Sequence, residues 1–414
     1  MMGLASIRTS ISRWVRGLGV WHKIGILLLI VILLYGTTIA LDNLLFRGWL
    51  TGWAGPSPDL EVYRERAQGI IDGLIPYRDF YAESPPIINY LLVPPQLFGG
   101  EAWMYAAYFS FFTFLTGALM YLLLRRFDEH LAFISGVLFV LSPFAYMEST
   151  WGIQDESIVV LLFILTPLLV VIGRSREGSI SLGAGIMTKM LSVMLTPILF
   201  LNRRPFRKHL EVFLYLVLTI FIISLPFLII CPNEFLSFPE YYFLEVEGAV
   251  MGGMSFWHFL EMGGFMIPGE IGLAITVITF LVATYFVFKK RFPIWLAALA
   301  LVLTFFTFYP KIHLGYFLIP IGFLIIWACE DFWIFFRTLL VYVPLGLATA
   351  FSESVKGTPP VDIPGGWIAG LVLSLIGLAI LWDTFRIVMK KRNFIDTGIE
   401  VEERLERTKI NVSE

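Results

Sequence analysis

The sequence is poor in charge and in cysteine. Asp, Glu, Lys and Arg supply only 15% of the 414 residues, whereas hydrophobic residues supply 57% and the mean hydropathy is +0.79. This composition excludes a soluble globular protein. The net charge of −2 lacks the basic excess of a nucleic-acid-binding protein, so we expect no nucleic-acid partner. The two cysteines, Cys231 and Cys329, fall at opposite ends of their predicted spans, which excludes a disulfide between them.

Long apolar runs take up almost half of the chain. Ten runs are long enough to cross a bilayer: 24–46, 101–124, 131–147, 157–173, 210–231, 269–288, 292–308, 314–329, 332–350 and 366–386. They predict an all-α polytopic membrane protein with about ten spans, surrounded by membrane lipids. Basic residues up to Lys23 precede the first run, which is typical of a signal peptide or of an anchor. Because this run continues to about Phe46 and Trp49 follows it, we favour an uncleaved anchor.

The basic residues predict the topology. Their clusters, at Arg125–Arg126, Arg174 and Arg176, 203–208, 289–291 and 390–392, alternate along the chain with acidic or aromatic loops. Since basic loops favour the cytoplasmic side, both termini are expected in the cytoplasm. We therefore expect a cytosolic N-terminus at 1–23, a single transmembrane domain at 24–388 with an external loop at 47–100, and a cytosolic tail at 389–414. From Ile395 onward this tail is charged and lacks an apolar face.

The segment 181–201 does not fit this alternation. It is long enough to cross, yet basic loops lie on both sides of it, and Lys189 and Pro197 interrupt it. A re-entrant pair of half-helices entering from the cytoplasm resolves the conflict, because irregular backbone is tolerated inside protein. Under this topology Lys189 is cytoplasmic, and it has a structural or lipid-binding role.

The first external loop predicts two interfacial elements. From Asp59 onward, Leu60, Tyr63, Ala67 and Ile70 recur at helical spacing, and Gly73 is placed to end that helix. We expect this amphipathic helix to lie on the membrane. The apolar stretch 85–98 is too short to span and predicts a second interfacial element.

The residues of this loop resemble a known family. "DLEVY" followed by "GLIPYRDFYAESPP" is similar to the first external loop of the GT-C superfamily of integral-membrane glycosyltransferases, which use polyprenyl-phosphate sugars. "TWGIQDESI" resembles the superfamily's second external acidic motif, although Gly-x-Gln-Asp here replaces the usual Gly-Gln-x-Asp. "KMLSVMLTP" and "YPKIHLGYFLIP" resemble its lysine-containing short helices and a late external loop. The resemblance implies a GT-C-like helical bundle over roughly 24–329.

The resemblance also implies roles for particular residues. Asp59 matches the superfamily's catalytic base, and Asp155 or Glu156 matches the second acidic residue of the site. The phosphate needs fixed positive charge, for which we favour Lys311 and His313. The remaining predicted substrate-binding residues are Tyr63, Arg64, Arg78 and Glu83.

Each of these residues also has a structural interpretation. Asp59, Asp155 and Glu156 suit the first turn of a helix, where the helix dipole favours acids. Arg64 and its charged neighbours suit a solvated face or lipid headgroup contacts. Lys311 and His313 suit an ordinary loop.

The sequence therefore predicts an inverting glycosyltransferase, a hexosyl- or pentosyltransferase, that moves a sugar from a polyprenyl-phosphate donor to an acceptor outside the cytoplasm. The expected location is the cell membrane, or the endoplasmic reticulum in a eukaryote. The alternatives are a lipid or solute transporter or flippase, which commonly shows internal repeats that are not visible here, and a non-catalytic scaffold. No cofactor is expected. A divalent metal held by Asp59 and Asp155 is conceivable, but the chain has no dense carboxylate cluster and we expect none.

Overall fold

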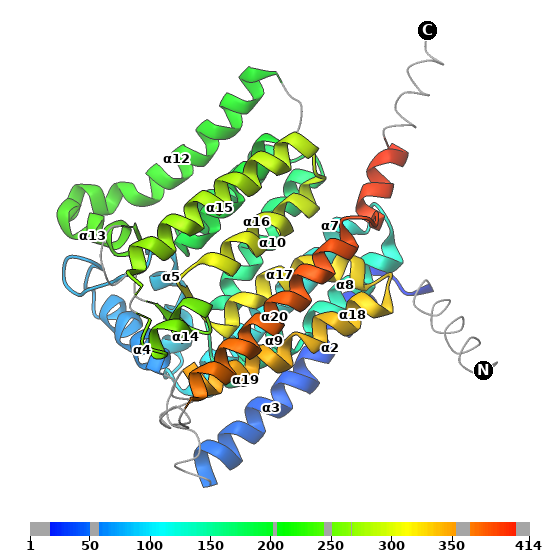
Figure 1. Cartoon of the computed structure of the whole chain (residues 1–414). Coiled ribbons are helices and arrows are strands. Elements are labelled where there is room, and N and C mark those ends of the chain that lie inside the picture. Colours follow the sequence, from blue (N-terminus) through cyan, green and yellow to red (C-terminus); the bar gives the residue numbers. More distant parts are fainter. Residues whose placement is uncertain are drawn as a thin grey trace.

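The computed structural model describes residues 17–49, 58–201, 205–243, 251–265, 267–352 and 365–402. In these ranges the protein is a bundle of long helices that run side by side (Figure 1). The strands of the described ranges are two residues long and form a single pair. The predicted all-α class is thus confirmed.

The first half of the chain contains the central bundle and several short helices. Its elements are α2 (Val20–Ile30), η1 (Val31–Tyr35), α3 (Gly36–Leu41), η2 (Asp42–Trp49), α4 (Pro58–Ile71), α5 (Pro86–Leu91), α6 (Val93–Leu97), α7 (Ala102–Leu124), α8 (Glu129–Val140), α9 (Pro143–Met147), η3 (Glu148–Gly152), α10 (Glu156–Val171), α11 (Ser175–Ile186) and η4 (Met190–Phe200). The elements η1, η2 and η3 are π-helical, and η4 is a 3₁₀-helix.

The second half surrounds this bundle. Its elements are α12 (Phe206–Ile230), α13 (Pro232–Phe243), β1 (Gly252–Gly253), α14 (Phe256–Met262), α15 (Gly269–Lys290), α16 (Ile294–Phe308), β2 (Lys311–Ile312), η5 (Leu314–Phe317), α17 (Leu318–Ala328), α18 (Phe332–Leu340), α19 (Tyr342–Ser352) and α20 (Gly366–Val388).

Each of the ten predicted apolar runs coincides with helical structure. By length and composition, six helices of the described ranges are able to cross a membrane, and a seventh crossing is formed if the pair Glu129–Val140 and Pro143–Gly152, bent by 46°, counts as one span. The helices α10, η4 and α16 and the segment Leu314–Ala328 are apolar but shorter. The exact number of ten spans therefore stays a prediction.

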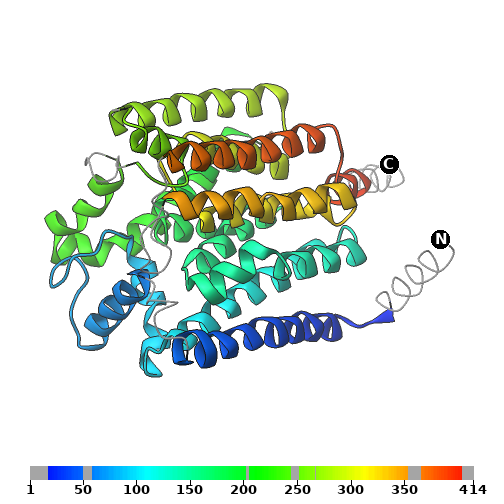
Figure 2. The same ribbon diagram turned by 60° about the horizontal axis from the view of Figure 1, so that its bottom comes forward.

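The two ends of the bundle differ in composition. The start of α2 and the end of α20 lie at one end, whereas α4, α5 and α14 lie at the other (Figures 1 and 2). At the first end the buried Lys23 binds Glu129 at 2.7 Å, and Arg126 binds Glu402 at 2.7 Å. The basic clusters of α7 and α20 thus share one end, as the positive-inside pattern predicts. Which side of the membrane this end faces stays a prediction.

Close packing in the bundle depends on glycine. A Cβ atom on Gly136 of α8 would lie 2.6 Å from the carbonyl oxygen of Gly117 of α7. Small residues let two helix backbones approach closely, which replaces the hydrophobic driving force that is absent within lipid. The helices α7 and α8 therefore pack with their backbones in close contact.

The predicted cytosolic tail is only partly an extension. Residues 394–402 are helical, and Phe394 and Ile395 are 6% and 0% exposed. The backbone N–H of Phe394 donates to Glu330 at 2.8 Å, and Trp327 donates to the carbonyl of Lys391 at 3.1 Å. The expectation that the tail lacks a packing face is wrong over 394–402, because two apolar residues in sequence are enough to anchor it. Residues 403–414 lie outside the described residues.

The segment 181–201 forms a helical hairpin. The helix α11 follows α10 after a tight turn, in which the N–H of Arg174 donates to the carbonyl of Leu169 at 2.8 Å. A Cβ atom on Gly185 would lie 3.1 Å from the hydroxyl of Ser192, so α11 and η4 pack against each other. The hairpin turns at Thr188 and Lys189. This agrees with a pair of half-helices, while their re-entry into the membrane stays a prediction.

Candidate active site

The helix α4, predicted to lie on the membrane surface, packs on protein. Leu60, Tyr63 and Ala67 on its apolar face are at most 7% exposed and form a cluster with Tyr105 and Phe109 of α7. This burial places the predicted amphipathic face against the bundle and not against lipid. The helix ends as predicted at Gly73, whose φ of 82° belongs to the left-handed region that glycine adopts without strain.

Asp59 meets the second acidic motif. The side-chain amide of Gln154 donates to the Oδ2 atom of Asp59 at 2.6 Å, although 95 residues separate the two. Asp59 is exposed at the start of α4, where partial positive charge of the helix N-terminus favours a carboxylate. The structure therefore brings together the two motifs that the sequence singled out.

Ile153 directs this motif with a left-handed backbone. Its φ of 53° is rare for a β-branched residue, and such conformations typically cost about 1–3 kcal/mol. The side chain is 1% exposed in the cluster that contains Tyr63, so its burial offsets the strain. The reversal leads the N–H of Gln154 back to the carbonyl of Glu148 at 3.0 Å. This departure from the usual motif thus has a structural role.

Lys189 lies against the acidic motif, although the sequence predicted it on the other side of the membrane. Its ammonium is 3.2 Å from Asp155 and 2.5 Å from Glu156, and the Lys189 side chain is 14% exposed. The ring of Tyr316 lies 4.9 Å from the same nitrogen. The prediction that Lys189 and the acidic motif lie on opposite sides of the membrane is therefore wrong. The basic loops on both sides predict only where the two termini of the hairpin lie. The hairpin is long enough to place its turn, with Lys189, at the other end of the bundle.

Tyr63 lies at the centre of these charges. Its hydroxyl oxygen accepts a hydrogen bond of 3.3 Å from the backbone N–H of Asp155. Burial, and then the charges of Asp155, Asp59 and Glu156, raise the pKa of Tyr63 well above its ordinary value. The phenol therefore remains protonated and neutral at the centre of the acidic groups.

Glu148 is a site neighbour that sequence reasoning missed. It is 8% exposed, and a Cβ atom on Gly315 would lie 3.0 Å from its Oε2 atom and 3.1 Å from Cγ of Glu156. The Oε2 atom of Glu156 is buried and has no hydrogen-bond partner in the described residues. In the sequence, only the position of Glu148, four residues before Gly152, indicated that it lies near the site. An acidic residue at that position suits a loop equally well.

Lys311 and His313 lie around the strand pair. The residues Lys311 and Ile312 of β2 pair with Gly252 and Gly253 of β1, and the Cγ atom of Lys311 lies 3.2 Å from where a Cβ of Gly252 would be. Lys311 is half-buried, and no carboxylate of the described residues binds it. The ring of His313 packs at 5.6 Å on Tyr316, which in turn covers Lys189.

Three predicted binding residues have other partners. Arg64 donates to the carbonyl of Gly100 at 2.7 Å and to Glu61. Arg78 binds its neighbour Asp79 at 2.8 Å. Glu83 binds Arg66 at 3.0 Å. The structure thus assigns Arg64 to the anchoring of α4, and it does not bring Arg78 and Glu83 to the carboxylates.

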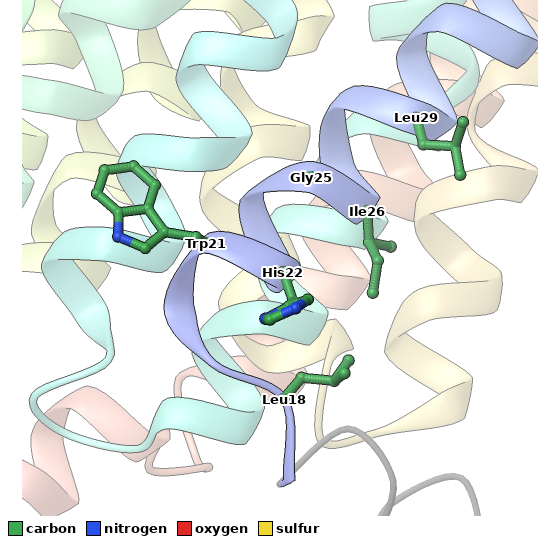
Figure 3. A pocket seen from close by; sticks show the side chains of 6 residues that line it. All are labelled: Leu18, Trp21, His22, Gly25, Ile26 and Leu29. Carbon is green, nitrogen blue, oxygen red and sulfur yellow. The ribbon is translucent and has the colours of Figure 1, made fainter.

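An open depression on α2 lies at the other end of the bundle. Figure 3 shows its lining on the outer side of the helix: Leu18, Trp21, His22, Gly25, Ile26 and Leu29. Apart from His22 this lining is apolar, which suits lipid contact. Within the described part of the chain, no group of three His, Cys, Asp or Glu residues is arranged to hold a metal ion. Independence from metal stays a prediction.

Comparisons with known proteins give two findings. Residues 83–230 match the family described as dolichyl-phosphate-mannose-protein mannosyltransferase. This range includes the acidic motif and Lys189 but begins after Asp59. A search of curated proteins found no match.

The fold resembles that of a solved structure. The crystal structure of ArnT from Cupriavidus metallidurans, bound to undecaprenyl phosphate, superposes with a TM-score of 0.51. The alignment covers 87% of this chain and 77% of ArnT at 13% identity. In sequence over residues 83–230 and in fold over most of its length, the chain resembles the GT-C superfamily of integral-membrane, polyprenyl-phosphate-dependent glycosyltransferases.

Proposed function

We propose that the protein transfers a sugar from a polyprenyl-phosphate donor to an acceptor outside the cytoplasm, with inversion at the anomeric carbon. Asp59 acts as the general base. One observation carries the proposal: the carboxylate of Asp59 and the motif of Asp155 and Glu156 meet through the 2.6 Å hydrogen bond from Gln154.

The chemistry requires one base and no protein acid. The departing polyprenyl phosphate is a monoester with a second pKa of about 6, so it leaves as a stable anion. The acceptor hydroxyl must lose its proton as it attacks the opposite face of the sugar. Asp59 is exposed at the end of the bundle and is thus accessible to an acceptor that arrives from water. A single carboxylate then suffices, in contrast to the carboxyl pair of glycoside hydrolases.

Lys311 suits the donor phosphate. It is half-buried without a carboxylate partner in the described residues, and β1 and β2 hold its backbone in place. The carbonyl of Pro310 also accepts hydrogen bonds from the N–H of Gly252 and from the hydroxyl of Ser255. A fixed cation of this kind stabilises phosphate charge as it develops. His313 adds a second donor close by, and Asp155 and Glu156 position the sugar.

The test compares Asp59→Asn with wild type in membranes supplied with labelled polyprenyl-phosphate sugars. Asparagine still accepts the hydrogen bond from Gln154 but does not take a proton, so we expect unchanged insertion and a loss of transfer of at least about 100-fold. Glu61→Gln, two residues further along α4, removes an exposed carboxylate that binds Arg64 and should leave transfer unchanged.

Wild-type turnover by Asp59→Asn would remove Asp59 from the mechanism. If the wild-type protein formed no glycosylated product but moved the labelled lipid across the bilayer, the protein would be a flippase. The panel of sugars also identifies the donor, including whether a hexose or a pentose is moved.

A further inference from the structure

We propose that Lys189 is a positioning residue that keeps Asp59 ionised and aligned by balancing the negative charge of Asp155 and Glu156. The inference rests on the proposed function only in naming Asp59 as the base. It assigns a task to the residue that sequence reasoning placed at the wrong end of the molecule.

The first step is the geometry of Lys189. A single ammonium lies 3.2 Å from Asp155 and 2.5 Å from Glu156, and it joins the hairpin turn to the start of α10. Its position is further fixed by the Tyr316 ring and by the bond from the N–H of Lys189 to the carbonyl of Gly185 at 2.8 Å. A buried ammonium is costly unless anions surround it, and here they do.

The second step is the charge balance. The ionisable groups on the elements around Tyr63 are Asp59, Glu61, Arg64, Glu65, Arg66, Glu148, Asp155, Glu156, Lys189, His313 and Tyr316. Arg64 binds Glu61, and Arg66 binds Glu83. In the described residues, Lys189 is the cation in contact with the acidic motif. The carboxylates of Asp155 and Glu156 therefore share its positive charge, and Asp59 lies next to them through its hydrogen bond with Gln154.

The third step is the path to Asp59. Gln154 directly precedes Asp155, and Ile153 before it is locked by its burial and its left-handed backbone. Holding Asp155 in place thus holds the amide of Gln154 on Asp59. Lys189 acts on the base in two ways, since it fixes this peptide segment and opposes the field of its two carboxylates.

Loss of the charge has a defined sign. Without Lys189, the uncompensated carboxylates favour protonation of every acid nearby, Asp59 included. Activity that depends on ionised Asp59 should then appear only at higher pH. A shift of roughly 0.5–1 pH unit is expected for the loss of one charge in a partly solvated site.

The experiment measures two quantities in nanodiscs. The first is the pH dependence of transfer, and the second is the titration midpoint of ¹³C-labelled aspartate carboxyls, with the Asp59 signal assigned by Asp59→Asn. We expect Lys189→Gln to move both midpoints upward by 0.5–1 unit and Lys189→Arg to restore them in part. The double variant Lys189→Gln with Glu156→Gln removes one charge of each sign and leaves no unpaired charge between these two residues, so it should fold even if Lys189→Gln alone does not. Its two midpoints should lie closer to those of wild type than the midpoints of Lys189→Gln do.

Lys23→Gln is the matched control. Lys23 is also a buried ammonium bound to a glutamate, but it lies at the other end of the bundle. Its loss should lower thermal stability and leave both midpoints unchanged. An Asp59 midpoint in Lys189→Gln equal to that of wild type would overturn the proposal. If Lys189→Gln does not fold, equal Asp59 midpoints in the double variant and in Glu156→Gln alone would overturn it. The carboxyl titration needs no substrate, so it decides about Lys189 even if the wild type transfers no sugar and the proposed function fails.

Discussion

At the scale of single residues, Gly315 determines how closely the acids pack. A Cβ atom there would lie 3.0 Å from an oxygen of Glu148 and 3.1 Å from Glu156, closer than side chains normally allow. We expect Gly315→Ala to lower the free energy of unfolding by about 1–2 kcal/mol through overpacking. Transfer should fall about tenfold, because Glu156 must move away from Lys189.

Thermal unfolding in detergent and the rate of transfer check this expectation. Gly346→Ala serves as the control, because the nearest atom to its new Cβ, on the ring of Tyr342, is at an ordinary 3.8 Å. Full activity of Gly315→Ala would show that the acids tolerate displacement.

Residue-level reasoning from the sequence succeeded where a motif or a helical period indicated the position of a residue, and it failed for partners that neither of them indicates. Helical spacing correctly predicted the buried face of α4, and the two acidic motifs do meet. Lys189 was misplaced because a hairpin brings its turn to the end opposite its own termini. Arg64 and Glu83 were assigned to substrate although a carbonyl and an arginine bind them, and composition cannot reveal such partners.

At the scale of elements, docking of the segment 394–402 should depend on pH. Burial of the Asp396 carboxyl raises its pKa to about 6 from an ordinary 3.8, with Arg392 opposing and Glu400 adding to the shift. Burial also raises the pKa of Glu330, which binds Phe394. The docked segment therefore binds protons more tightly than the free one, and docking strengthens as pH falls through 6 toward 4.

The effect is on the order of 1–2 kcal/mol after solvent screening. A spin label at the exposed Thr397 measures it, and its mobility should be lower at pH 5 than at pH 7.5. Asp396→Asn should reduce this difference and keep the label more immobile at pH 7.5. Equal mobility at both pH values in the wild type would contradict the assignment.

At the scale of the whole molecule, the two ends of the bundle should face opposite sides of the membrane. In a Cys231→Ser, Cys329→Ser background, we expect Glu65→Cys on α4 to react with a membrane-impermeant maleimide in intact cells. Lys390→Cys, exposed at the other end, should react only after permeabilisation. The reverse labelling pattern would place the candidate site in the cytoplasm.

Hydropathy predicted the positions of the helices well, whereas the number of times that the chain crosses the membrane stays a prediction. All ten apolar runs are helical, yet α10 and α16 have only 16 and 15 residues. A helix of about 20 residues is long enough to cross a bilayer by itself. A shorter apolar helix is also stable inside a bundle, where neighbouring helices surround it and it does not have to span the bilayer. Sequence length alone does not distinguish these two cases.

The helices α12 and α15 stand at the margin of the bundle, and only 17% of the most apolar stretch of each is buried. Hydrocarbon chains, more than neighbouring side chains, therefore keep these two helices in place. A purification that strips away lipid would therefore loosen these two helices before it disturbed the carboxylates of the candidate site. If a preparation transfers no sugar, loss of lipid is the first cause to test.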